Sequence, residues 1–157
     1  MQNKKYRVDY TQKIEEFGRT LYRIVALANF GNVTTGDQGG YIESERNLSP
    51  YDNAWVYDNA RVYGNARVYD NARVYDNAIV YDNAEVAKLC ITVGTSKYYC
   101  TISDTHMAIG CKNYTFSEWE NFTKEEISKM DVKAWEWWTQ WKPILFEILK
   151  VENKVKT

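Results

Sequence analysis

The middle of the chain repeats one pattern of apolar and polar residues every six positions. Residues 62–84 read VYGNARVYDNARVYDNAIVYDNA. An α-helix has 3.6 residues per turn and would spread these valines around its whole circumference, whereas short strands separated by turns return each valine to the same inward position. The repeat therefore predicts β-structure with one column of buried valines: Val56, Val62, Val68, Val74, Val80 and Val86.

Each repeat unit divides into a short strand and a corner. In Ala-x-Val, the alternation of a strand directs Ala and Val inward and the middle residue outward. The Asp-Asn or Gly-Asn pair predicts the corner, because Asn and Gly tolerate the positive φ that a sharp turn needs.

This pattern resembles the left-handed parallel β-helix of hexapeptide-repeat proteins, in which an aliphatic residue leads each hexad and a small residue follows four places later. The pairs from Val56 with Ala60 to Val80 with Ala84 match that motif. The resemblance implies that three hexads complete one triangular coil, that residues 18 apart stack, and that the flat faces assemble into a homotrimer. Two regular coils are short for a solenoid. We therefore interpret residues 39–54 as a degenerate first coil, with Ile42 and Leu48 in phase with Ala54.

The flanking sequence is similar to hexapeptide-repeat proteins carried by bacteriophages and prophages. The similarity covers about residues 17–120 and includes TLYRIVALANFGNVTTGDQGG and IGCKNYTFSEW. The matching positions are Leu21, Tyr22, Arg23, Ile24, Gly39, Gly40, Glu45, Asn47, Leu48 and Ser49. This resemblance implies a viral origin and little about activity.

With 18 residues per coil, the three outer faces carry Arg, Tyr and Trp side chains. Arg, Tyr and Trp are enriched in interface hot spots, so the faces are candidate partner-binding surfaces. The alternative is that each Tyr simply stacks on its neighbour one coil away. We expect a cation–π contact between Trp55 and Arg73 and a surface pair between Arg67 and Glu85. The candidate binding residues are Trp55, Arg61, Tyr63, Arg67, Tyr69, Arg73 and Tyr75.

The corners stack as well. Asp52 is expected below Asp70, which raises the alternative of a cation site along one edge. Ladders of stacked asparagine amides, such as Asn53 below Asn71, explain the corners without an ion. We therefore predict no metal and no cofactor.

β-structure is also expected on both sides of the repeat. Residues 5–11 and 19–27 predict a hairpin that turns at Phe17-Gly18 and covers one end of the coils. The alternating sets Leu89, Ile91, Val93 and Tyr98, Cys100, Ile102 predict a second hairpin, with a turn at residues 94–96. The expected division is an N-terminal β cap (1–40), the β-helix (41–88) and a C-terminal module (89–157) that combines this hairpin with Trp-rich helices.

Helical signals begin at Thr123. Thr123 and Glu126 match a capping box, and Asp131 is expected to cap a helix that begins with AWEWWTQW. Pro143 fits either the first turn of a last helix or a kink in a longer one. One helical stripe contains Trp138, Trp141, Leu145, Ile148 and Leu149, and is read as core or oligomer contact. Trp135 and Trp137 point away from it and are candidate partner contacts.

Composition excludes several classes of protein. The 157 residues carry 20 basic and 21 acidic side chains, a net charge of −1, so no global field attracts nucleic acid or an anionic membrane. No window of about 18 apolar residues predicts a membrane span. Cys90, Cys100 and Cys111 are odd in number and form no CxxC, which fits reduced thiols in the cytoplasm.

Three functions remain open at this stage. Many hexapeptide-repeat proteins are acyltransferases with a histidine base. The single histidine here, His106, follows the repeat and is expected in a turn or bonded to a backbone carbonyl. The preferred hypothesis is a non-catalytic binding protein that counteracts a bacterial defence by sequestering a nucleotide-like signal or occluding an immune protein. A structural phage component is ranked lower, because two coils make a poor spacer.

Overall fold

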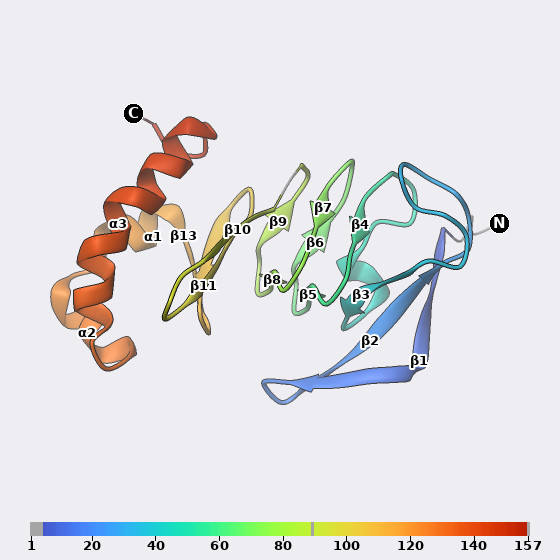
Figure 1. Cartoon of the computed structure of the whole chain (residues 1–157), viewed down its shortest axis with the longest axis horizontal. Coiled ribbons are helices and arrows are strands. Elements are labelled where there is room, and N and C mark those ends of the chain that lie inside the picture. The colour runs from blue at the N-terminus through green and yellow to red at the C-terminus, as the bar shows by residue number, and fades with distance from the viewer. Residues whose placement is uncertain (1–4, 89, 157) are drawn as a thin grey trace. The chain divides into compact units, whose positions relative to one another are not determined.

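The computed structural model describes residues 5–88 and 90–156. The chain is mainly β with helices at its C-terminal end, and it divides into two compact units between Asn113 and Tyr114. The first unit contains the repeat, the N-terminal hairpin and the strands that follow the repeat, and the second contains the helices (Figure 1).

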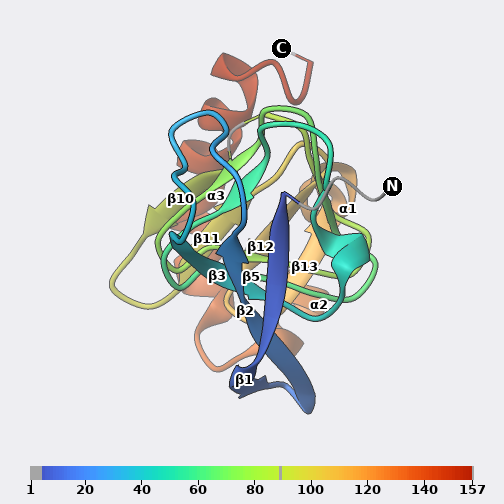
Figure 2. The ribbon, with the colours of Figure 1, turned by 90° about the vertical axis from the view of Figure 1, so that its right-hand side faces the viewer.

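The repeat forms a parallel β-solenoid of two-residue strands. The first three strands pair in parallel with the strands 18 residues later: Trp55 with Arg73, Arg61 with Ile79 and Arg67 with Glu85. The expected 18-residue coil is confirmed, and Figure 2 shows the coils overlying one another. The strands are β4 (Trp55–Val56), β5 (Arg61–Val62), β6 (Arg67–Val68), β7 (Arg73–Val74), β8 (Ile79–Val80) and β9 (Glu85–Val86).

The solenoid interior is filled by the valine and alanine columns. All six valines and all six alanines of the repeat are buried. Burial of each valine contributes roughly 1.5 kcal/mol, so the columns hold the coils together. Because these side chains fill the interior, a ligand has to bind at the outer surface.

The corners differ in one respect from the expectation. The positive φ falls on the first residue of the Asp-Asn or Gly-Asn pair, so Asp rather than Asn adopts the left-handed conformation at four corners: Asp58, Gly64, Asp70, Asp76 and Asp82 have φ between 52° and 65°. The Asn at the second position stacks on the Asn of the next coil. Asn53 Nδ2 donates to Asn71 Oδ1 at 3.2 Å, and Asn65 Nδ2 to Asn83 Oδ1 at 3.3 Å, which confirms the amide ladders.

Carboxylates also contribute to the corners. The Oδ2 of Asp52 accepts from the N–H of Asp70, one coil above, at 2.7 Å. In the same way, Glu43 Oε2 accepts a hydrogen bond from the N–H of Gly64 at 2.7 Å. Stacked aspartates are thus explained by backbone hydrogen bonds, and the described residues contain no group of His, Cys, Asp or Glu suited to a metal ion.

A first, irregular coil precedes the regular ones. β3 (Gln38–Ile42) pairs in parallel with β5, which places Ile42 beside Val62, and Leu48 bridges to Val68. These residues therefore occupy the valine column, 20 positions before their partners, and the expected phase with Ala54 is wrong. The two additional residues fall between Leu48 and Val56, where the short helix η1 (Glu45–Asn47) has just ended.

The N-terminal hairpin is confirmed. β1 (Tyr6–Glu16) and β2 (Arg19–Ala26) are antiparallel and turn at Phe17-Gly18, and β2 pairs with β3. The hairpin thereby joins a five-stranded sheet of order β1-β2-β3-β5-β8. At its start, the Lys5 Nζ donates to the carbonyls of Asp52 at 3.0 Å and Ala54 at 2.7 Å, and these bonds satisfy one end of the coils.

The strands after the repeat cover the other end. They are β10 (Ile91–Gly94), β11 (Tyr99–Ile102), β12 (His106–Ile109) and β13 (Lys112–Thr115), in that order in one sheet. The hairpin formed by β10 and β11 confirms the expected one, although Leu89 lies outside the described residues. Side-chain oxygens of Thr101, Thr105 and Asp104 accept from the N–H groups of Ile79, Glu85 and Ala87.

The second unit contains α1 (Phe116–Asn121), α2 (Lys124–Met130) and α3 (Ala134–Val151). The Thr123–Glu126 capping box is confirmed at the start of α2. Asp131 instead ends α2 as its C-cap residue, and α3 begins after Lys133, whose φ is 61°. Pro143 lies inside α3, so the longer of the two expected helices forms.

Candidate functional site

The paired strands define three faces of the solenoid: β4 and β7 form the first face, β5 and β8 the second, and β6 and β9 the third. The second face is covered by the N-terminal hairpin. Tyr63 is only 4% exposed and stacks on Tyr81, with ring centroids 5.0 Å apart, beneath Leu21 of the hairpin. The guanidinium of Arg61 pairs with Glu16 of the hairpin at 3.1 Å. Arg61 and Tyr63 were expected to contact partners, but they hold the N-terminal hairpin instead.

Trp55 is also buried, with 1% of its surface exposed. It lies in register with Arg73, as expected, but its ring makes edge contacts with Tyr6 and Phe30 at centroid distances of 6.2 and 5.3 Å. The expected exposed position of Trp55 is wrong, because Tyr6 and Phe30, which precede the repeat, cover it.

The periodic tyrosines stack from coil to coil. Tyr57 and Tyr75 lie 4.5 Å apart with an interplanar angle of 17°, like the pair on the second face. The hydroxyl of Tyr69 donates to Glu85 at 3.3 Å. Stacking and hydrogen bonding thus explain the repetition of Tyr without a ligand, while Arg73 and Arg67 on the first and third faces remain exposed.

A groove of about 530 Å³ lies beside the third face, between the irregular first coil and β6. Its apolar residues include Leu48 and Val68, which are buried, and Pro50. Tyr51, whose surface is 83% exposed, stands at its border. The full lining is Glu45, Arg46, Leu48, Ser49, Pro50, Tyr51, Asn65, Arg67, Val68 and Tyr69.

The groove combines cationic and aromatic groups. Arg46 and Arg67 contribute two guanidinium groups against the single carboxylate of Glu45. The Arg67 guanidinium lies 5.8 Å from the centre of the Tyr69 ring. Burial, followed by the neighbouring Glu85 carboxylate, raises the pKa of Tyr69, so its hydroxyl stays protonated at neutral pH.

The sequence predicted two of the four cationic and aromatic residues of the groove. Arg67 and Tyr69 belong to the repeat and were expected on an outer face. Arg46 and Tyr51 were missed, because the irregular first coil has no fixed period from which an outward direction can be read. The only available signal was the break in the hexad pattern around Pro50, which Tyr51 follows directly.

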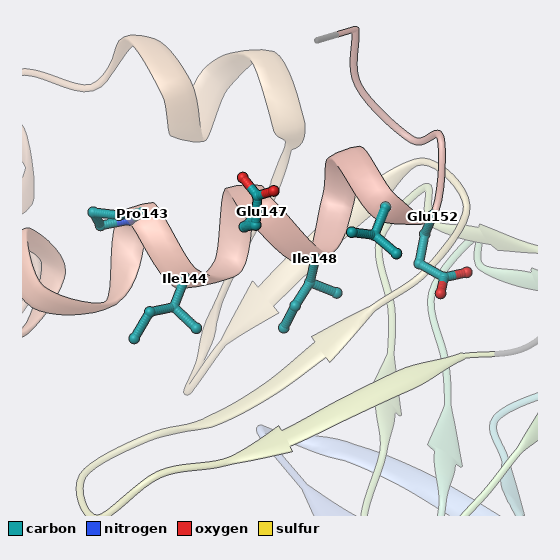
Figure 3. A pocket seen from close by; sticks show the side chains of 6 residues that line it. Pro143, Ile144, Glu147, Ile148 and Glu152 are labelled. Carbon is teal, nitrogen blue, oxygen red and sulfur yellow. The ribbon is translucent and has the colours of Figure 1, made fainter.

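The helical unit shows a second apolar surface. Trp137, a candidate partner contact, is 8% exposed and stacks on Trp141 at 5.8 Å, so it is buried within the helical unit. Trp135 is half-buried, with the Lys124 Nζ 6.0 Å from its ring. Figure 3 shows an apolar concavity along α3, where Ile144 lies between Pro143 and Glu147 and Ile148 lies between Glu147 and Glu152. Its lining is Pro143, Ile144, Glu147, Ile148, Val151 and Glu152.

His106 is the first residue of β12 rather than part of the preceding turn. Its ring Nδ1 lies 2.8 Å from the hydroxyl oxygen of Thr105, and its N–H donates to Ser103 Oγ at 2.9 Å. Both contacts are made to residues of the turn before β12, and they stabilise the segment that caps the solenoid.

Comparison with known families agrees with the repeat geometry. A model of the YdcK beta solenoid repeat matches residues 54–70, 60–74, 66–82 and 72–86, which overlap across β4 to β9. The chain is thus a repeat β-solenoid protein. No curated protein matches it. Among the described residues, no helix combines the length and apolar character needed to cross a bilayer.

Proposed function

We propose that the chain is a phage-encoded, non-catalytic binding protein that counteracts a bacterial defence system in the host cytoplasm. It acts by sequestering a nucleotide-like signal or by occluding an immune protein. The observation that carries the proposal is the set of exposed Arg and half-buried Tyr side chains on the first and third faces, with the groove beside them.

The packing of the solenoid supports binding at the surface. The Ala and Val columns fill the interior. Hydrogen bonds close both ends of the coils: Lys5 donates at one end, and Thr101, Thr105 and Asp104 accept at the other. Any partner therefore meets the outer faces, where Arg and Tyr supply cationic and aromatic contacts.

The phage origin and the assembly rest on the resemblance to phage hexapeptide-repeat proteins. We propose that the coils are left-handed and that three copies associate through flat faces. Because the hairpin covers the second face, the first and third faces are the surfaces that remain for copies and partners.

The experiment is phage plating on bacterial strains that each carry one defence system. Expression of the protein is expected to raise the plaque count at least tenfold in a sensitive strain. The double variant Arg67→Ala/Arg73→Ala is expected to lose this protection. Arg7→Ala is the matched control, since Arg7 is an exposed arginine outside the two open faces.

Protection in no strain, or full protection by the double variant, would contradict the proposal. The variant His106→Ala is expected to protect like the wild type. If His106→Ala loses protection and Arg67→Ala/Arg73→Ala keeps it, acyl transfer becomes the favoured function.

A further inference from the structure

We infer that the groove between η1 and β6 binds a planar aromatic anion of the size of a nucleoside monophosphate. This inference rests on the proposed function and narrows it to a small ligand. It assigns two roles in one site: Tyr51 and Tyr69 contact the ring, and Arg46 and Arg67 contact the anionic group.

The dimensions of the groove fit a small molecule. Its volume of about 530 Å³ lies within the range of roughly 300–1,000 Å³ that is usual for small-ligand sites. The groove is concave, whereas the neighbouring solenoid faces are flat and better suited to protein surfaces. This contrast favours a compact ligand at the groove over a polypeptide.

The backbone around the groove is fixed before any ligand binds. The buried side chain of Asn47 donates through Nδ2 to the carbonyls of Gly64 at 3.1 Å and Ala66 at 2.9 Å, and so ties η1 to the next coil. From the other side, the hydroxyl of Tyr6 donates to the carbonyls of Glu45 at 3.2 Å and Leu48 at 2.9 Å. A site built on such fixed backbone loses little entropy on binding.

The aromatic part of the ligand is expected over the apolar groove residues. Leu48, Val68 and Pro50 offer apolar surface, and the Tyr51 ring is exposed directly beside them. An exposed tyrosine ring at the rim of an apolar concavity can stack on a planar ligand and exclude water from one of its faces.

The anionic part of the ligand follows from the charges of the lining. Arg46 lies on η1 and Arg67 on β6, so cationic groups come from two elements of the groove. Together with Glu45, the lining carries a net charge of +1. Guanidinium groups bind phosphate through paired hydrogen bonds, so a phosphate ester on the ring satisfies both requirements.

The test is isothermal titration calorimetry of the full chain with three kinds of probe: the four ribonucleoside monophosphates, adenosine, and inorganic phosphate. At least one monophosphate is expected to bind, and at least tenfold more tightly than adenosine or phosphate alone. Arg67→Ala and Tyr51→Ala are each expected to weaken that binding at least tenfold. The controls Arg7→Ala and Tyr10→Ala change exposed residues outside the groove and are expected to bind like the wild type.

Absence of binding by all four monophosphates, or unchanged affinity in both groove variants, would overturn the inference. Plating of Arg67→Ala and Tyr51→Ala separates this outcome from failure of the proposed function. If both groove variants still protect the phage, the function stands and the groove assignment fails. If they lose protection although no monophosphate binds, the groove takes a protein, and the small-ligand assignment fails.

If the wild type binds a monophosphate but protects no phage, the groove assignment stands and the anti-defence function fails.

Discussion

Phe17 combines two features that are costly for a single residue. It lies at the tip of the N-terminal hairpin with φ of 46°, a conformation that bulky side chains seldom adopt, and its surface is 65% exposed. Gly18 follows with φ of 75°, so the turn has the two positive φ values that Asn-Gly satisfies best. Phe17 is therefore an unfavourable choice for folding.

Phe17→Asn is expected to stabilise the protein by about 1 kcal/mol, because Asn tolerates positive φ and removes an exposed apolar ring. This corresponds to a rise in Tm of roughly 2–4 °C for a chain of this size. Thermal unfolding followed by circular dichroism measures the change. A lower Tm for Phe17→Asn would show that the ring makes contacts that stabilise the hairpin.

Lys5 is a buried charge at the end of the coils. Burial lowers the pKa of its ammonium group to about 8, although Asp52 at 3.7 Å acts in the opposite direction. The folded protein therefore releases the Lys5 proton at a lower pH than the unfolded chain, whose lysine pKa is near 10.4. The contribution of Lys5 to stability must then rise with pH above about 8.

The free energy of unfolding of the wild type, minus that of Lys5→Met, is expected to increase between pH 7.5 and 9.5. Its size is of the order of 1 kcal/mol after allowance for solvent screening. Urea unfolding at the two pH values measures the difference, and the variant cancels contributions from other titrating groups. A difference that is constant or falls with pH would contradict the burial of a charged Lys5.

At the scale of elements, the two-residue strands at the end of the solenoid need hydrogen-bond partners outside the repeat. The N–H groups of the last regular coil point away from the coils below and must be satisfied by residues that follow the repeat. Asp104 accepts from Ala87 at 2.6 Å and Thr105 from Glu85 at 3.0 Å, so the segment before β12 acts as a cap.

Asp104→Ala is expected to lower the free energy of unfolding by about 1–3 kcal/mol, because it leaves a partly buried N–H without its acceptor. Asp104→Asn is the matched control, since its amide oxygen can still accept that bond, and is expected to lose less than half as much. Urea unfolding of the three proteins measures both effects. Equal losses in the two variants would assign the role to the charge rather than to the hydrogen bond.

The elements that the sequence predicts well are those with a fixed period. The columns of Val and Ala, the 18-residue register and the asparagine ladders all follow from the hexad pattern. The register of the first coil does not, because two additional residues enter between Leu48 and Val56. α1 was also missed, although Thr115 and Glu118 form the same capping box that marks α2.

Burial of the outward residues could not be predicted in the same way. The repeat indicates that Trp55 and Tyr63 leave the solenoid interior, and this direction is correct. Tyr6 and Phe30 cover Trp55, and Leu21 covers Tyr63. These three residues precede the repeat and pack on it by long-range contacts. The groove likewise depends on η1 and β6, elements 20 residues apart that only the folded coil brings together.

At the scale of the molecule, the solenoid unit is closed against indefinite growth. Its two ends are capped and its second face is covered by the hairpin, so we propose that copies associate through the first and third faces. Restriction to two side faces is compatible with a closed ring of copies and disfavours end-to-end stacking of solenoids. Helical filaments are not expected.

Native mass spectrometry of the protein, purified from bacteria with an activated defence system, tests the central claim most directly. The account predicts a trimer that carries an added mass of a few hundred daltons per binding site, and predicts that Arg67→Ala removes this mass while the trimer remains. A trimer without added mass, or one bound to a host polypeptide, would contradict the small-ligand assignment. A monomer would contradict the proposal that the open solenoid faces assemble.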